Sequence, residues 1–155
     1  MVPDGYEYAG FWLRVAASLI DTVLVLLITV PLLLAVYGVS PEGMTSSGFA
    51  AIPNILISYV APAIAVIAFW VARQATPGKM VFGARIVDAK TGNSLTVAQS
   101  IGRYLGYFVS TIPFGLGLIW VAFDPRKQGW HDKLAGTVVV RPKTRVPVAV
   151  TFQGP

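Results

Sequence analysis

The stretch FWLRVAASLIDTVLVLLITVPLLLAVYG, residues 11–38, is long and apolar enough to cross a lipid bilayer. A crossing helix needs roughly 20 mostly apolar residues. Residues 15–37 meet that need with Asp21 as their only ionisable side chain. The whole chain of 155 residues is 55% hydrophobic and 12% charged, with a mean hydropathy of +0.67. The sequence therefore predicts a small integral membrane protein.

Asp21 is the unusual residue in this predicted helix. A carboxylate near the middle of a bilayer costs on the order of 3 kcal/mol, so such residues normally face a protein interior or a water-filled cavity. Arg14, Ser18 and Asp21 share one helical face. Arg14 precedes Asp21 by a rise of roughly 10 Å, which allows a direct pair or one bridged by water. We expect Asp21 to lie inside the helix bundle, within reach of Arg14 or of Arg103 in a later apolar segment.

A second apolar run of crossing length covers residues 52–72. Asn54, Ser58 and Pro62 recur every four residues and therefore lie on one face, where Pro62 is expected to kink the helix. Asn54 and Ser58 are placed to hydrogen-bond Asp21 across the helix pair. The alternative, which we favour, is that these polar residues join two membrane helices without a role in transport.

The third apolar segment, residues 97–123, is broken in its second half by Pro113, Gly115 and Gly117. Thr96 and Gln99 have the spacing of a capping box, which predicts a helix beginning at residue 97. Gly102, Gly106 and Ser110 form a stripe of small residues that favours close helix packing. That packing is expected within the subunit, with a seam between two copies of the chain as the alternative.

The distribution of basic residues sets the expected topology. Residues 73–96 contain four Lys or Arg and residues 124–145 contain six, whereas the loop at 39–51 contains none. Basic loops favour the cytoplasmic side, so both stretches and the N-terminus are expected there. This favours a re-entrant hairpin over a third span for the broken segment. Residues 84–88 and 137–140 are rich in β-branched residues and are expected to pair as two short strands on that side.

The expected fold is thus an all-α polytopic membrane protein with a small cytoplasmic β element. It has two full transmembrane helices and a third, Pro/Gly-broken segment that is a re-entrant hairpin or a third span. One domain covers residues 11–140, and residues 141–155 form a tail. The last four residues, FQGP, resemble the end of a viral protease site carried by expression vectors and are set aside.

Composition argues against several other classes. The chain has no cysteine and one histidine, so disulfides and thiolate metal sites are excluded and neither a metal nor a cofactor is expected. Its net charge of +5 comes from residues that flank apolar segments, which favours anionic lipid over nucleic acid as the partner. Thr76 and Lys79 have the spacing of a Ser/Thr-x-x-Lys motif, and Gly78 with Lys79 weakly suggests a phosphate loop. The remaining parts of both motifs are missing, so neither is given a function.

Four features together resemble the RDD family of bacterial membrane proteins: Arg14, Asp21, TPGKMVFGARIVD (residues 76–88) and DPRKQGWHDKLAGTVVV (residues 124–140). The family is named for an arginine and two aspartates. The resemblance maps these to Arg14, Asp21 and Asp132, with Asp124 as the competing candidate for the last. It implies a multi-pass protein of the bacterial inner membrane, from a family of mostly uncharacterised members, some of which are associated with sodium/proton antiport.

Two functions remain open from the sequence. In the first, Asp21 is an ion or proton site, helped by Arg14 and Arg103, and the protein is a transporter of a monovalent cation or proton. Three helical segments are few for a transport pathway, so such a transporter is expected to be a homo-oligomer. In the second, the charges are structural and the protein is a membrane scaffold.

The scaffold reading gives function to the cytoplasmic face, where Trp130, His131 and Asp132 are expected to contact a partner. An enzyme is the least favoured class. His131 and Asp132 are adjacent and therefore point apart on a helix, and no nucleophile motif accompanies them. A structural role is favoured for His131.

Overall fold

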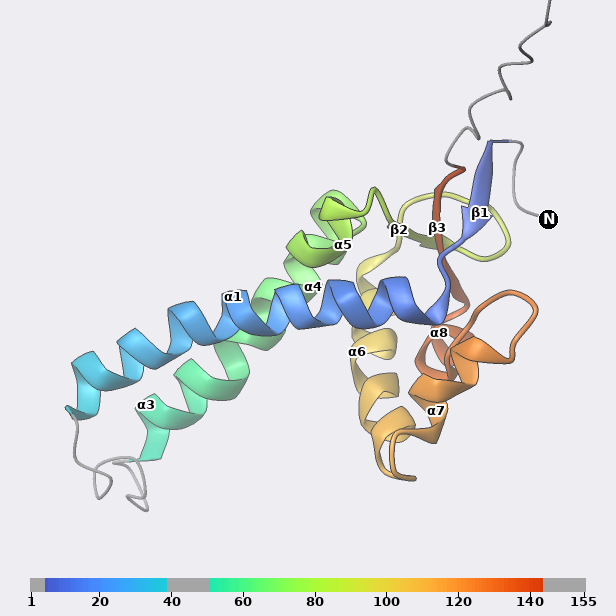
Figure 1. Cartoon of the computed structure of the whole chain (residues 1–155). Helices are drawn as coiled ribbons and strands as arrows, with labels where there is room; N and C mark the ends of the chain where they lie inside the picture. The colour runs from blue at the N-terminus through green and yellow to red at the C-terminus, as the bar shows by residue number, and fades with distance from the viewer. Residues whose placement is uncertain (1–4, 39–50, 144–155) are drawn as a thin grey trace, which may run out of the picture.

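The computed structural model describes residues 5–38 and 51–143, and two candidate membrane spans dominate it. Helix α1 covers Phe11–Tyr37. The second span is built from α3 (Ile52–Ile55), the π-helical turn η2 (Leu56–Val60) and α4 (Ala61–Arg73). The two run side by side away from the rest of the molecule (Figure 1). They confirm the two predicted crossing helices, whereas most of the loop at 39–51 and the FQGP end lie outside the described residues.

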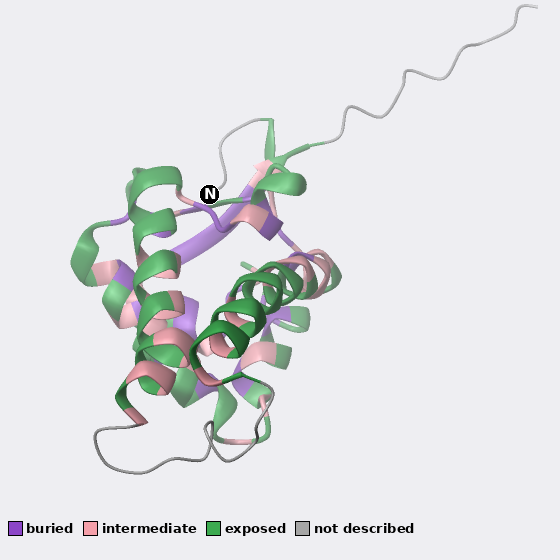
Figure 2. Ribbon diagram, turned by 90° about the vertical axis from the view of Figure 1, so that its left-hand side faces the viewer, coloured by how far each residue is buried: buried purple, intermediate pink, exposed green. Residues whose placement is uncertain are grey.

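Both spans have the surface expected of helices that face lipid. The most apolar window of α1 has a mean hydropathy of 2.7 with none of its residues buried, and that of the second span has 2.3 with 6% buried. Figure 2 shows exposed residues along the outer helix surfaces, while the buried residues concentrate toward the strands. Pro62 is the second residue of α4 and follows the π turn directly, at the position where its missing backbone N–H cannot bond to the preceding turn.

A three-stranded antiparallel sheet closes the opposite end. Strand β2 (Arg85–Asp88) pairs with β3 (Thr137–Pro142) in the register Ile86 opposite Val139. This confirms the predicted pairing of residues 84–88 with 137–140. The third strand, β1 (Tyr6–Tyr8), was not predicted. It lies on the other side of β3, giving the order β1-β3-β2 and extending the folded unit beyond residues 11–140 at both ends.

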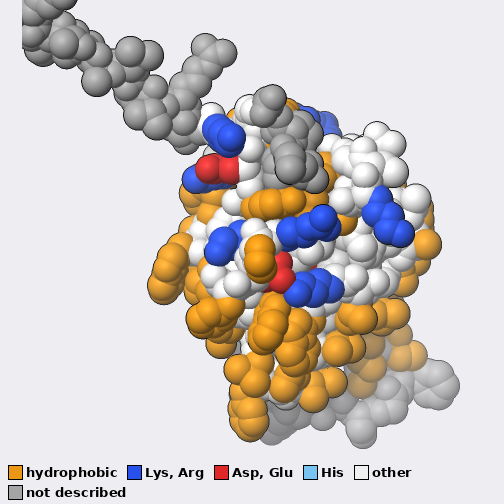
Figure 3. Space-filling view, turned by 90° about the vertical axis from the view of Figure 1, so that its right-hand side faces the viewer, with side chains coloured by type: hydrophobic (Ala, Val, Ile, Leu, Met, Phe, Trp, Pro, Cys, Tyr) orange, Lys and Arg blue, Asp and Glu red, His pale blue; other side chains and the backbone are white. Residues whose placement is uncertain are grey.

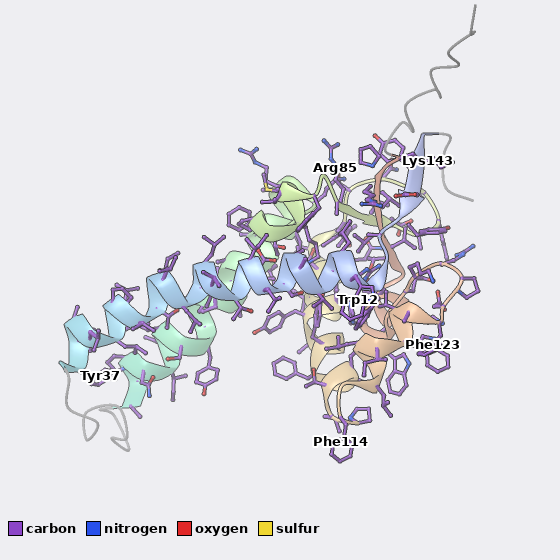
Figure 4. The ribbon with its side chains drawn as sticks, viewed as in Figure 1. Trp12, Tyr37, Arg85, Phe114, Phe123 and Lys143 are labelled. Atoms are coloured by element: carbon purple, nitrogen blue, oxygen red, sulfur yellow. The ribbon has the colours of Figure 1, made fainter. Side chains whose placement is uncertain are left out.

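The broken apolar segment forms a hairpin. Helix α6 (Val97–Thr111) begins at the predicted capping box, in which the backbone N–H of Gln99 donates to Thr96 Oγ1. The chain then bends by 113° into α7 (Leu116–Ile119) and the 3-10 turn η3 (Trp120–Ala122). Because β2 precedes this hairpin and β3 follows it, both of its ends lie at the same sheet. The bent pair is a broken span or a re-entrant loop, the two alternatives expected from the sequence, and Phe114, 97% exposed, lies at the bend (Figure 4).

The short helix α8 (Trp130–Ala135) packs against α6 and leads into β3. A Cβ on Gly106 would lie 2.8 Å from His131 Cα, whereas a Cβ on Gly102 would meet nothing within 4 Å. The small-residue stripe thus serves packing within the subunit at Gly106. Figure 3 shows hydrophobic side chains over the lower part of the α7 and α8 face, with Lys and Arg side chains above them.

Candidate functional site

Two arginines converge on Asp132, a residue of α8 that is fully buried. Arg14 Nη1 lies 2.5 Å from Asp132 Oδ2, and Arg103 Nη1 forms an ion pair with Oδ1. Arg14 also donates to the carbonyls of Ala9 at 3.1 Å and Lys127 at 2.5 Å. This charge cluster, Arg14, Arg103 and Asp132, joins α1, α6 and α8. Arg103 is fully buried and Arg14 is 8% exposed, so the cluster is screened from solvent.

Local sequence places Asp132 at the centre of this cluster. Gly129 precedes α8, and its backbone N–H donates to Asp132 Oδ2 at 3.1 Å, so the side chain also caps its own helix. Gly136 ends α8 with φ +64, a left-handed conformation that glycine adopts without strain. Thr137 follows at once and its hydroxyl accepts from Arg103 Nη1 at 2.9 Å.

The arginines fix the charge states on α8. Burial alone would raise the pKa of Asp132, but the guanidinium groups of Arg103 and Arg14 hold it well below its usual range. Burial also lowers the pKa of His131 to about 3, and the two arginines add to this effect while Asp132 opposes it. His131 is therefore neutral at physiological pH. Its ring stacks on Tyr107 at a centroid distance of 4.0 Å.

Asp21 has different partners from those expected. Thr76 Oγ1 donates to its Oδ2 at 2.5 Å, and the Gly78 backbone N–H donates to its Oδ1 at 2.6 Å. Both donors belong to the start of helix α5 (Pro77–Val81). The expectation that Asp21 lies within reach of Arg14 or Arg103 is wrong, because both arginines are engaged by Asp132. Two hydrogen bonds from α5 satisfy the carboxylate instead.

The less favoured alternative, in which Asn54 and Ser58 hydrogen-bond Asp21, is not the arrangement observed. Ser58 Oγ donates to Asn54 Oδ1 at 2.9 Å within the second span. The segment that binds Asp21 contains Thr76 and Gly78, which the sequence shows only as parts of incomplete motifs. One signal marks it: a Cβ on Gly78 would lie 2.1 Å from the Ala17 carbonyl oxygen, so only glycine permits this approach to α1.

Lys79, next to Gly78, is 5% exposed. Its Nζ donates to Thr76 Oγ1 at 3.3 Å. It lines two cavities at the junction of α1 with α5 and α6. The Asp21 cavity, of about 430 Å³, also includes Asp21 and Trp70. The hairpin cavity, of about 390 Å³, lies between α1 and α7 and also includes Leu19 and Ile119.

The remaining motif residues lie on α8 and the turn before it. Asp124 Oδ1 pairs with Lys133 at 2.5 Å, and its Oδ2 accepts from the Gln128 backbone at 3.1 Å. Burial would raise the pKa of Asp124, but these bonds lower it below its ordinary value. Of the two candidate aspartates, Asp132 is therefore the one in contact with Arg14. Trp130 is half-buried and its ring lies 6.5 Å from that of Trp120.

The partner surface expected at Trp130, His131 and Asp132 needs correction. His131 is 3% exposed and Asp132 is fully buried, because their side chains turn inward to Tyr107 and the arginines. Neither side chain can therefore contact a partner in this conformation. Among the described residues, no group of three or more His, Cys, Asp or Glu is placed to hold a metal ion.

The sequence of this chain is similar to one protein family and to several bacterial proteins. The sequence model described as "RDD family" matches residues 8–136. An uncharacterized membrane protein of Bacillus subtilis (strain 168), YteJ, is 36% identical over 144 residues, covering 89% of this chain and 84% of its own length. The B. subtilis protein YxaI, also uncharacterized, is 31% identical over 150 residues, covering 85% and 96% of the two chains.

A shorter match covers 75 residues of an uncharacterized protein from Rickettsia prowazekii (strain Madrid E) at 41% identity. It spans 48% of this chain and 41% of that protein. No solved structure matches the chain.

Proposed function

The chain belongs to the RDD family of membrane proteins, and on that basis we propose that it is a non-catalytic membrane scaffold. In this proposal α1 is the central membrane helix to which an extramembrane cap is attached. The cap consists of the three-stranded sheet, the loop of residues 89–96 and the turn before α8. It faces the cytoplasm of a bacterial cell and acts by binding a partner.

One observation carries the proposal: the family's charged residues are all engaged in contacts between elements of this subunit. Arg14 attaches α1 to α8 through Asp132. Asp21 attaches α1 to α5 through Thr76 and Gly78. A site that binds and releases an ion needs ligands that become free, whereas these ligands are occupied by protein donors. Buried, paired charges of this kind instead fix one arrangement of the helices.

The cap offers a basic surface for a partner. Its exposed basic side chains are Arg85, Lys90, Arg126 and Lys143. Two of them, Arg85 and Lys143, project from the sheet end of the molecule, opposite Tyr37 at the far end of α1 (Figure 4). Basic residues at one end favour the cytoplasmic side of the membrane and an acidic binding surface.

Transport coupled to a cation or proton is the second candidate, and one observation favours it. Asp21 borders a cavity beside α1 whose lining includes several hydroxyl groups: those of Ser18, Thr22, Thr76, Tyr104, Tyr107 and Thr111. Carboxylate and hydroxyl oxygens are suitable ligands for small cations. Transport would require Asp21 to exchange its bonds to Thr76 and Gly78 for a cation or proton.

Flux measurements on purified protein in liposomes, with imposed sodium and proton gradients, separate the two proposals. The scaffold predicts no protein-dependent flux under either gradient. It also predicts that Asp21→Asn folds well, because an amide oxygen still accepts from Gly78 and the amide NH₂ can donate to Thr76. Asp21→Leu, the matched control, loses both bonds and leaves the buried Gly78 N–H without a partner, which costs about 1–3 kcal/mol.

A gradient-driven flux that disappears in a folded Asp21→Asn variant would overturn the scaffold and establish transport. The scaffold makes a second claim that flux does not test. Breaking the Arg14–Asp132 pair should release the cap, so limited proteolysis should cut Asp132→Leu between residues 124 and 136 faster than wild type. Equal cutting rates would contradict the proposed role of the cluster.

A further inference from the structure

Lys79 is a buried cation with no carboxylate in direct contact among the described residues, and Asp21 reaches it only through the Thr76 hydroxyl. It is 5% exposed, and its Nζ donates to one hydroxyl, that of Thr76. No carboxylate of residues 5–38 or 51–143 lies within 4.0 Å of it. Buried charged groups are normally paired, because an unpaired one loses its hydration without compensation. Lys79 therefore has donor capacity for an anionic partner.

The hairpin cavity has two chemically different parts. Its outer walls are apolar and come from α1, α7 and η3: Phe11, Val15, Leu19, Leu118, Ile119 and Val121. Its inner end holds polar groups that donate hydrogen bonds or carry positive charge, including Arg14, Lys79 and His131. His131 Nε2 is buried there without a hydrogen bond, and the Asp132 carboxylate that pairs with Arg14 lies 3.5 Å from it. An apolar channel that ends in cationic groups suits a ligand with an apolar chain and an anionic head.

Helix geometry places Lys79 near the edge of the hydrocarbon layer. The 27 residues of α1 rise roughly 40 Å, about 10 Å more than the hydrocarbon thickness of a bilayer. If the excess lies at the charged end near Arg14, the first two turns of α1 lie in the headgroup region. Gly78 contacts Ala17 and Asp21, just beyond those turns. The Lys79 ammonium is then at the depth where lipid phosphates meet the acyl chains.

We propose that the hairpin cavity binds an anionic phospholipid of the surrounding leaflet, with its phosphate on Lys79 and one acyl chain between α1 and α7. The volume of about 390 Å³ lies in the usual range of ligand sites, roughly 300–1,000 Å³, and accommodates a headgroup with the upper part of one chain. The cavity opens beside residues of α1 and α7 that face lipid, such as Leu19, 63% exposed, and Ile119, 43% exposed. A lipid can therefore enter sideways from the bilayer.

Charge complementarity favours this occupant over a cation. Arg14 and Lys79 both line the hairpin cavity, whereas Asp21 lines only the Asp21 cavity on the other side of Lys79. A phosphate would supply the direct anionic contact that Lys79 lacks within the described chain, where Asp21 reaches it only through Thr76. The proposal is independent of the scaffold and of transport, since neither requires a lipid at this position.

Thermal unfolding of the full-length protein in a neutral detergent tests the proposal. The probes are dioctanoyl phosphatidylglycerol, which is anionic, and dioctanoyl phosphatidylcholine, which is zwitterionic. We expect the glycerol lipid to raise the melting temperature more than the choline lipid. In Lys79→Met the affinity for the glycerol lipid should fall about tenfold or more, as for loss of a charged hydrogen bond. The matched control, Lys90→Met, removes an equal charge from an exposed turn and should keep wild-type affinity.

A second variant separates lipid binding from the folding role of Lys79. Leu118→Trp keeps every charge but fills the apolar part of the hairpin cavity, so it should also weaken binding of the glycerol lipid. The proposal is overturned by wild-type affinity in either Lys79→Met or Leu118→Trp. It is also overturned if the two lipids stabilise the wild type equally, or if Lys90→Met loses as much affinity as Lys79→Met.

Discussion

Acidification should lower the free energy of unfolding of this protein through its single histidine, His131. In the fold the pKa of His131 is lowered to about 3, whereas an unfolded histidine titrates near 6.5. Between these values the unfolded chain binds a proton that the folded chain does not bind. Stability is therefore highest above pH 6.5 and falls as the pH drops toward 3.

The size of the effect follows from the interval between the two pKa values. Each pH unit inside the interval changes the free energy of unfolding by about 1.4 kcal/mol, so a step from pH 7 to pH 5 removes about 2 kcal/mol. The pKa of Asp132 is also lowered, but its contribution is lost only near and below the unfolded value of about 3.9. Acid loss above pH 5 is therefore assigned to His131.

Denaturant unfolding in detergent micelles at pH 7 and pH 5 measures this loss. His131→Phe is the comparison, because a phenyl ring can keep the stack on Tyr107 but cannot titrate. Wild type should lose about 2 kcal/mol between the two pH values, and the variant should lose little. An equal loss in both proteins would refute the assignment, and another titrating group would then be responsible.

Three further predictions concern packing, the charge cluster and topology. Gly106→Ala should destabilise the protein by about 1–3 kcal/mol because its Cβ meets the α8 backbone. Gly102→Ala on the same helix should be neutral or stabilising. Equal melting temperatures of the two variants would contradict the α6–α8 packing. Asp132→Leu should cost about 3–5 kcal/mol because it leaves two buried arginines without a carboxylate, and Arg14→Leu should cost less because Asp132 keeps its ion pair with Arg103. The double variant should lose less than the sum of the two losses, and additive losses would mean that the pair is not coupled. A single cysteine replacing Lys143 should react with a membrane-impermeant reagent only after the cytoplasmic side is opened, and labelling of intact cells would place the sheet outside.

The sequence predicted the elements whose signals are local. Residues 11–37 are continuously apolar, Thr96 and Gln99 carry a capping box, and the strand pair has matched β-branched runs. Strand β1 escaped because three residues, Tyr6–Tyr8, are too few for a periodic pattern. They form a strand because β3 offers them a free edge.

The partners of the buried charges could not be predicted from the sequence, because they depend on which helices pack together. Asp21 and Arg103 were matched as the charges inside apolar segments, but Arg103 lies on α6, whose polar face packs on α8 and so meets Asp132. Asp21 instead accepts hydrogen bonds from the Thr76 hydroxyl and the Gly78 backbone N–H, and neither donor carries a charge. Hydrogen bonds to the main chain are invisible to any argument that counts ionisable residues. The burial of Lys79 was not predicted for the same reason, because it depends on the residues that pack around Lys79 in the fold.

The strand order has a consequence for synthesis of the chain at the ribosome. The first and last strands are linked by the ion pair of Glu7 with Arg141, 134 positions apart, and the central strand is the last to be made. Until β3 emerges, β1 and β2 have no partner between them, and Arg14 has no Asp132 to neutralise it. Both spans are therefore synthesised before the sheet can form. Completion of the sheet then requires that both spans and the hairpin have already been synthesised, and a product truncated before residue 137 leaves β1 and β2 without the strand that joins them.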